Sequence, residues 1–252
     1  EGIDLLNQPG DLLEYDFFYD NDYAKWTKLA NTVKMVAFLN TGNNAAFNAI
    51  VNNGNFINTS ADDFQFQYGT NETNPDTRHP SYNGNYNVTG TGGYQSVWLM
   101  GTMLNLDDPR LRYYFYRQSD CTPGASCNPG GSQTTLTCSV APRPNHFPAD
   151  MLFCSLEEGY WGRDHGNAEG IPPDSFQKTA GGVYPIGGSF DDDRFTSVVV
   201  GGGAGGAGIV PIMLAAWTDL MRAEVALASG SAGSASTLLS SALNKHMTKV
   251  LS

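Results

Sequence analysis

The stretch DYAKWTKLANTVKMVAFLNTG, residues 22–42, decides the fold class. Its apolar residues recur three and four positions apart, which is the period of a helix with one apolar face. Asp22 is a suitable N-cap for this helix, and Thr41-Gly42 is a suitable end. The predicted apolar stripe consists of Trp26, Leu29, Ala30, Val33, Val36 and Ala37.

A second helix is predicted immediately after the first, in NNAAFNAIVNNG, residues 43–54. Phe47 and Ile50 lie on its apolar face, and Gly54 marks its end. Two such helices joined by a short turn form a helical hairpin over residues 22–54.

The same pattern recurs at the other end of the chain, over residues 209–252. Pro211 suits a first helical turn, and a second helix is expected after SGSAGS, residues 229–234. Both hairpins have the size of tetratricopeptide units. One such hairpin cannot bury its apolar stripe alone, so each implies further helices or a partner surface. The stripe of the first helix is Leu214, Trp217, Met221, Val225 and Ala228.

Residues 55–208 have little helical period and are rich in Gly, Pro and polar turns. We interpret them as a loop-rich insertion with a few short strands, and an ordered insertion of this length is usually functional. The predicted fold class is therefore mainly α: tetratricopeptide-like helical hairpins with a long loop-rich insertion.

A glycine-rich run, TSVVVGGGAGGAGIVP at residues 196–211, has the G-x-G-x-x-G spacing of dinucleotide-binding loops. Such a site also needs a second strand that carries an acidic residue about 20 positions further on. Here a predicted helix follows, and Glu224 lies within it. We interpret the run as a flexible glycine linker that re-enters the helical scaffold, and we expect no cofactor.

The charge balance narrows the choice of partners. The chain has 14 basic and 25 acidic residues, a net charge of −11. This disfavours nucleic acid and anionic lipid as main partners. No apolar run approaches the roughly 20 residues of a membrane span.

The four cysteines lie close together in a stretch rich in Pro, Gly, Ser and Thr. The spacing of Cys121 and Cys127 fits zinc knuckles poorly. We therefore favour disulfides, which imply an oxidising compartment, and three pairings remain open. The disulfide candidates are Cys121, Cys127, Cys138 and Cys154.

A sugar-binding face needs exposed aromatic rings on loops, with polar groups nearby. By contrast, Trp26 and Trp217 lie on helical stripes and Trp98 lies in an apolar run, so these three are predicted to be core residues. The predicted ligand-binding aromatics are Tyr82, Tyr86, Tyr94, Tyr160 and Trp161.

Two acidic clusters are candidates for chemistry. Asp164, His165 and Glu169 would serve a hydrolase if they converged on a cleft. Neighbouring Gly and Pro residues favour turn bonds and salt bridges instead, so no catalytic residue is predicted. The triplet 191–193, formed by Asp191, Asp192 and Asp193, is a weak candidate for a Ca²⁺ site, and a solvated turn is favoured over a metal.

One segment resembles a known family: GYWGRDHGNAEGIPPDSFQKTAGGVYPIGGSFDDD, residues 159–193. It is similar to the signature loop of SusD/RagB-like outer-membrane nutrient-binding lipoproteins. The segments ADDFQFQYG (61–69) and DDPRLRYYFYRQ (107–118) strengthen the resemblance, as does the stretch 22–39.

The resemblance implies one SusD-like domain over residues 1–252, incomplete because the family's N-terminal lipid anchor and repeats and its C-terminal section are not in this sequence. It implies a cell-surface protein, anchored in the outer membrane by lipid, that binds oligosaccharides or, in some branches, peptides. It also implies a partner, a SusC/RagA-like TonB-dependent transporter, and no catalysis.

Overall fold

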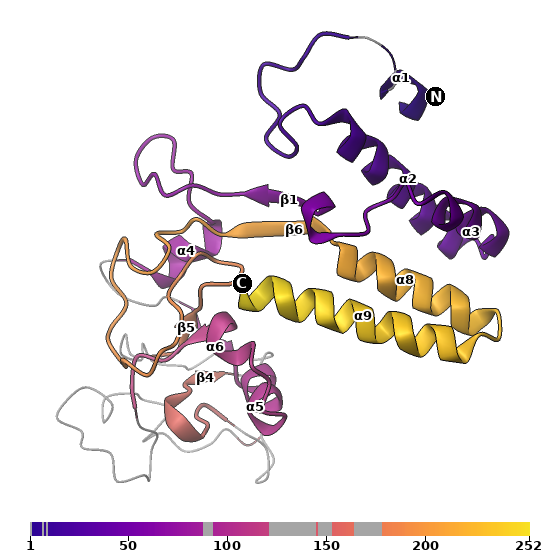
Figure 1. Ribbon diagram of the computed structural model, residues 1–252. Coiled ribbons are helices and arrows are strands. Elements are labelled where there is room, and N and C mark those ends of the chain that lie inside the picture. The colour runs from indigo at the N-terminus through magenta and orange to yellow at the C-terminus, as the bar shows by residue number, and fades with distance from the viewer. Residues whose placement is uncertain are drawn as a thin grey trace. The chain divides into compact units, whose positions relative to one another are not determined.

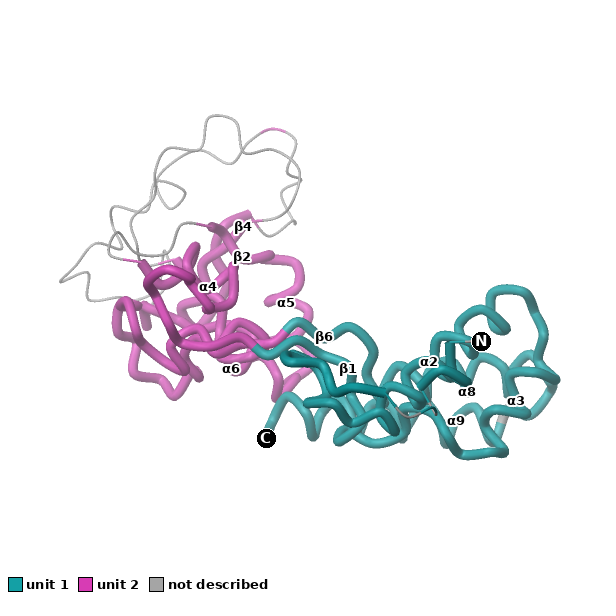
Figure 2. Tube along the Cα trace, turned by 90° about the horizontal axis from the view of Figure 1, so that it is seen from above, with its two compact units in different colours: residues 1–67, 210–252 teal, residues 68–209 magenta. Residues whose placement is uncertain are grey.

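The computed structural model describes residues 2–6, 8, 10–87, 93–120, 145, 153–163 and 178–252. The chain divides into two compact units, residues 1–67 with 210–252 and residues 68–209 (Figure 2). Both predicted hairpins lie in unit 1, and most of the predicted insertion forms unit 2. The mainly helical class with a few short strands is confirmed.

Unit 1 contains the two hairpins and one small sheet, in which β1 pairs with β6 (Figure 1). Residue Ile209 of β6 belongs to unit 2. The elements are α1 (Gly2–Leu6), α2 (Tyr23–Asn40), α3 (Asn44–Asn53), a 3-10 turn (Ser60–Asp62), β1 (Phe64–Gln67), β6 (Ile209–Met213), α8 (Ala215–Ala228) and α9 (Ala232–Leu251).

Local capping sets the ends of α2 and α3. The Asp22 carboxylate accepts hydrogen bonds from the backbone N–H of Ala24 and Lys25, as the sequence predicts. Asn43 caps α3, and Gly54 ends it in the left-handed conformation with φ of 75°. The predicted hairpin over residues 22–54 is therefore present.

The core of unit 1 joins the two hairpins. Met35 of α2 packs with Phe47 and Ile50 of α3, with Phe56, and with Val225 of α8. The two hairpins therefore share one core, to which α2 contributes the face with Met35 rather than the predicted stripe.

The buried face of α2 differs from the predicted stripe. Thr27, Thr32 and Met35 are its buried residues, whereas Val33 is 54% exposed. Thr32 is buried without penalty because its hydroxyl donates to the Lys28 carbonyl and accepts from the backbone N–H of Ile57. Of the predicted stripe, Val33 and Ala37 are exposed and the other four residues are half-buried.

Two expectations at the start of the second hairpin are wrong. Pro211 lies in β6, and α8 begins only at Ala215. The backbone N–H of Ala215 donates to the Asp63 carboxylate at 2.7 Å, which fixes that helix start. Trp217 is 37% exposed rather than core, because the first turn of α8 buries Ala215 and Ala216 instead.

Asp16 organises the turn that precedes α2. Its carboxylate accepts hydrogen bonds from the backbone N–H of Phe18, Tyr19 and Asn21 and from the Trp26 indole at 2.7 Å. Burial alone raises the pKa of Asp16, but the bonds from Trp26 and the three backbone groups outweigh it and lower the pKa to about 2.

Replacing Asp16 by asparagine will destabilise the protein by about 2 kcal/mol at pH 7, because one acceptor oxygen becomes a donor that faces other donors. Since the folded pKa lies below the ordinary 3.8, Asp16 stabilises the fold above that pH and loses this effect as the pH falls toward 2. Urea unfolding at pH 7 and pH 2 checks this: the difference between wild type and variant should shrink in acid. An equal difference at both pH values would contradict it.

Unit 2 is built from short elements. Strand β2 pairs with β4 in parallel, Gln95 opposite Gly162, and β3 pairs with β5 in antiparallel, Phe115 opposite Gly181. The elements are α4 (Pro80–Asn85), β2 (Gln95–Ser96), α5 (Val97–Asn105), α6 (Leu111–Tyr114), β3 (Phe115–Tyr116), a 3-10 turn (Glu157–Gly159), β4 (Gly162–Arg163) and β5 (Ala180–Gly181).

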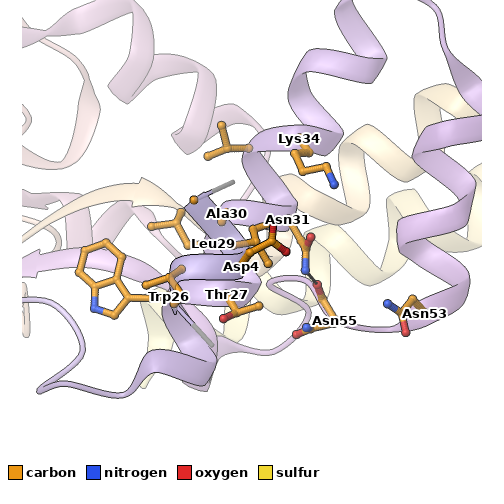
Figure 3. A pocket seen from close by; sticks show the side chains of 13 residues that line it. Asp4, Trp26, Thr27, Leu29, Ala30, Asn31, Lys34, Asn53 and Asn55 are labelled. Atoms are coloured by element: carbon orange, nitrogen blue, oxygen red, sulfur yellow. Dashed lines mark hydrogen bonds between the residues drawn. The ribbon is translucent and has the colours of Figure 1, made fainter. Parts of the chain in front are cut away.

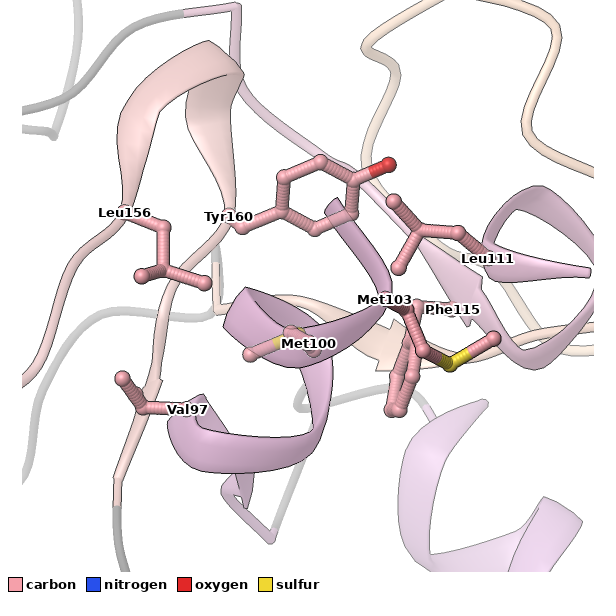
Figure 4. Close-up of a cluster of buried hydrophobic side chains, with 7 residues drawn as sticks. All are labelled: Val97, Met100, Met103, Leu111, Phe115, Leu156 and Tyr160. Carbon is pink, nitrogen blue, oxygen red and sulfur yellow. The ribbon is translucent and has the colours of Figure 1, made fainter. Parts of the chain in front are cut away.

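A hydrophobic cluster beneath α5 forms one core of unit 2 (Figure 4). One face of α5 contributes Val97, Met100 and Met103, and these side chains are buried. The opposite face of α5 points away from this cluster. The remaining members are Leu111, Phe115, Leu156 and Tyr160.

The glycine-rich run is packed tightly rather than free as a linker. A Cβ added at Gly203 would lie 2.1 Å from the Gly188 carbonyl oxygen, and one at Gly208 would lie 2.2 Å from that of Pro185. The backbone N–H groups of residues 204–208 all donate to backbone carbonyls of the same unit. They are therefore not available to bind a phosphate. The interpretation as a flexible linker is wrong.

Among the described residues, no helix combines the length and the apolar character that crossing a membrane requires.

Candidate functional site

Two of the predicted ligand-binding tyrosines are core residues. Tyr82 and Tyr86 are buried, and their rings stack with centroids 4.6 Å apart. The Tyr82 hydroxyl donates to the Gly202 carbonyl at 2.9 Å. The Tyr86 hydroxyl donates to the Gly181 carbonyl at 2.8 Å, and burial raises the pKa of Tyr86 to about 12. They hold the loops of unit 2 together and offer no face to a sugar.

Tyr160 and Trp161 are also buried, so the prediction that they form a binding platform is wrong. The Tyr160 ring faces the Arg117 guanidinium at 4.9 Å. Trp161 packs against Cys154, which is disulfide-bonded. The other disulfide candidates, Cys121, Cys127 and Cys138, lie outside the described residues.

Tyr94 is the remaining predicted aromatic, and it is half-buried. Two cations lie over its ring, Lys178 at 4.5 Å and Arg163 at 4.8 Å from the centroid. Trp98, predicted to be core, is 63% exposed on the outer face of α5. Its helix buries Val97 and Met100 instead, so the apolar run SVWLM contains two outward positions, Trp98 and Leu99, that its composition does not single out.

The acidic triplet is paired with arginines. Asp191 is fully buried and contacts Arg117 at 2.7 Å. Asp193 pairs with Arg112 at 2.8 Å, and Asp192 pairs with Arg194 at 2.5 Å. Asp193 also contacts Arg117, so all three carboxylates are paired with arginines, which does not fit the weak Ca²⁺ hypothesis. The alternative hydrolase residues Asp164, His165 and Glu169 lie outside the described part of the chain.

Unit 1 carries an open cleft between α1 and α2, with a volume of about 930 Å³ (Figure 3). This size is within the usual range of small-molecule sites. Helix α2 contributes the apolar residues Leu29, Ala30 and Val33 to the lining, and Trp26 lies at one end. The polar lining residues are Asp4, Thr27, Asn31, Lys34, Asn53 and Asn55.

The three asparagines of the cleft make few side-chain hydrogen bonds to other described residues of the protein. The Asn31 side chain donates to the Asn55 carbonyl at 2.8 Å. No other side-chain hydrogen bond of Asn31, Asn53 or Asn55 occurs within the described part of the chain. Trp26, in contrast, has its indole N–H engaged by Asp16. The cleft therefore offers an apolar strip flanked by carboxamides, which suits binding better than chemistry.

The comparisons identify the class of protein. A sequence profile of the SusD-like family, described as "Starch-binding associating with outer membrane", matches residues 2–139, more than half of the chain. The chain therefore belongs to this family, as the resemblance from sequence implies. Among curated proteins, none matches the chain.

Solved structures share the fold at low sequence identity. "Structure of BT1043" matches with a TM-score of 0.59 and 14% identity over 98% of this chain and 40% of its own. A SusD homolog from Bacteroides fragilis matches with a TM-score of 0.56 and 16% identity, over 98% of this chain and 45% of its own. A chitin-binding protein matches with a TM-score of 0.54 and 17% identity, over 98% of this chain and 46% of its own. This chain thus spans less than half the length of these three proteins.

Proposed function

We propose that this chain belongs to a cell-surface protein that captures oligosaccharides without cleaving them. Its place would be the outer membrane, to which a lipid anchor would attach it. Membership of a family described as starch-binding and outer-membrane-associated carries this proposal. The cleft of unit 1 is the proposed site, because its apolar strip suits the C–H faces of sugar rings and its carboxamides suit their hydroxyls.

Peptide capture is the alternative within the same family. The name of one structural neighbour, a chitin-binding protein, favours saccharide over peptide. A secreted hydrolase that uses Asp164, His165 and Glu169 is a further alternative, and the cleft itself supplies little for it. Within the described lining there is a single carboxylate, Asp4, and neither histidine nor cysteine.

Calorimetric titration with a panel of oligosaccharides and peptides, followed by chromatography of the same samples, tests the proposal. We expect saturable heat with at least one oligosaccharide and recovery of that ligand intact. Cleaved ligand would replace the proposal by the hydrolase. Absence of heat with every oligosaccharide would contradict it.

Delivery of the ligand to a SusC/RagA-like TonB-dependent transporter is the second part of the proposal. Purification of the tagged intact protein from outer membranes should retain a transporter of this type. If no such transporter is retained under conditions that preserve other outer-membrane complexes, delivery to a transporter is contradicted. The proposal that the protein captures oligosaccharides is not affected by that result.

A further inference from the structure

The start of α4 is capped by a histidine. The Nδ1 atom of His79 accepts a hydrogen bond from the backbone N–H of Ser81 at 3.1 Å. Caps are usually Ser, Thr, Asp or Asn, whereas histidine is the side chain whose ordinary charge change falls between pH 5 and 8. We propose that His79 is a pH-sensitive cap: when mild acid protonates its imidazole, the start of α4 and the glycine-rich run packed on it loosen together.

Protonation of His79 removes the cap directly. A neutral imidazole has one N–H donor and one acceptor nitrogen, whereas an imidazolium has two donors and no acceptor. In the folded protein Nδ1 is the acceptor nitrogen, so a proton added to the ring at that atom faces the Ser81 N–H. The hydrogen bond is lost, and two donors are brought together.

Burial opposes the charged form of His79. The residue is 9% exposed, and its ring meets the ring of Tyr68 edge-on with centroids 5.0 Å apart. Burial lowers the pKa of His79 below its ordinary value of 6.5. The cap therefore contributes fully to stability above pH 6.5, and its contribution is lost as the pH falls through the lower folded pKa.

The charges around His79 do not offset burial. Among the described residues, no carboxylate forms an ion pair with His79, because Asp76 and Glu72 pair with Arg78, at 3.0 and 3.7 Å. Arg78 adds a positive charge next to His79, which disfavours a second one. The glycine-rich run contains no titratable side chain. The titratable groups around His79 are Tyr68, Glu72, Asp76, Arg78 and Tyr82.

The cap and the glycine-rich run are joined through α4 (Figure 1). The backbone N–H of His79 donates to the Gly206 carbonyl at 2.9 Å, and the Tyr82 hydroxyl donates to the Gly202 carbonyl at 2.9 Å. A Cβ added at Gly206 would lie 2.9 Å from the Tyr82 ring. Helix α4 has only six residues, and so short a helix has few internal hydrogen bonds to hold its start without a cap.

Hydrogen–deuterium exchange of the intact protein at pH 7.5 and pH 5.5 tests the proposal, with His79→Asn as the matched variant. Asparagine is a strong N-cap that does not titrate, so comparing the two proteins at one pH cancels the effects of acid on other groups. At pH 7.5 their protection factors should agree over residues 81–87 and 201–208. At pH 5.5 those of the wild type should be lower over both segments, by up to about tenfold, because an opened His79 binds its proton with the ordinary pKa of 6.5.

Two further variants complete the test. His79→Leu has no acceptor, so its protection factors over residues 81–87 should be roughly fivefold lower than those of His79→Asn at both pH values. His246→Asn changes the other described histidine, in α9, and should keep the acid response of the wild type.

Equal protection of the wild type and His79→Asn at pH 5.5 overturns the proposal. An acid response of His79→Leu as large as that of the wild type also overturns it, which keeps the test independent of how well asparagine fits the site. A loss of protection confined to residues 81–87 overturns the coupling to the glycine-rich run.

Discussion

Replacing Asp191 by alanine will lower the free energy of unfolding by about 3–5 kcal/mol, the cost of removing the buried partner of a buried charge. The exposed Asp193 still contacts Arg117 in the variant. Arg117 and Asp191 are 3% and 0% exposed, and their side chains meet at 2.7 Å. The guanidinium lies between the rings of Tyr160 and Phe195, at 4.9 and 4.8 Å. Water therefore has little room to replace the lost carboxylate.

Arg117 stays protonated in the Asp191→Ala variant, because a guanidinium keeps its charge even without a carboxylate partner. Burial lowers the pKa of Arg117, but hydrogen bonds and attraction from Asp191, with help from Asp193, outweigh burial and raise that pKa above its usual value. The Asp191 carboxylate also accepts the backbone N–H of Arg117 at 3.1 Å. The substitution removes a charge partner and a backbone acceptor together.

Urea unfolding monitored by near-ultraviolet circular dichroism measures this effect. Asp192→Ala is the matched control, since the Asp192–Arg194 pair is exposed, with 44% and 55% of the side chains accessible. Loss of this exposed pair should change the free energy of unfolding by less than about 1 kcal/mol. Similar losses in the two variants would show that burial of Asp191 does not have the predicted consequence.

The helical hairpins could be predicted because their signals are local. Asp22, Asn43 and Gly54 act on backbone groups within a few residues of themselves. The period of the apolar residues then identifies a helix without reference to the rest of the chain. It does not identify which face is buried. On α2 the buried positions include Thr27 and Thr32, whose hydroxyls are satisfied by backbone groups that a sequence pattern does not reveal.

The same limit explains the outcome for the candidate site. Tyr86 is buried because its hydroxyl bonds Gly181 and Ser189, far along the chain. The Tyr86 ring is therefore buried, although the surrounding sequence is polar and rich in turn residues. Conversely, the stripe with Leu29 and Val33 was expected to be covered by further helices or a partner surface, and in this unit it lines the cleft. Long-range packing decides both cases, and one helix period cannot separate a core face from a binding face.

Gly203→Ala will destabilise the protein by about 2–5 kcal/mol, although the sequence places this residue in what resembles a flexible linker. Two costs combine. Gly203 has φ of 61°, where an alanine loses about 1–2 kcal/mol. Its new Cβ would also lie 2.1 Å from the Gly188 carbonyl oxygen, and displacing packed backbone adds about 1–3 kcal/mol. Chemical unfolding of the purified variant measures the sum.

Gly201→Ala separates the two costs. Gly201 lies in the same run with φ of 78°, but nothing lies within 4 Å of its added Cβ. It should lose only the 1–2 kcal/mol of the left-handed conformation. Because the Gly188 carbonyl also accepts the backbone N–H of Ala204 at 3.0 Å, moving it to admit a methyl at position 203 breaks a further contact. A true linker would tolerate both alanines equally, so equal small losses would restore the interpretation that the packing of this run contradicts.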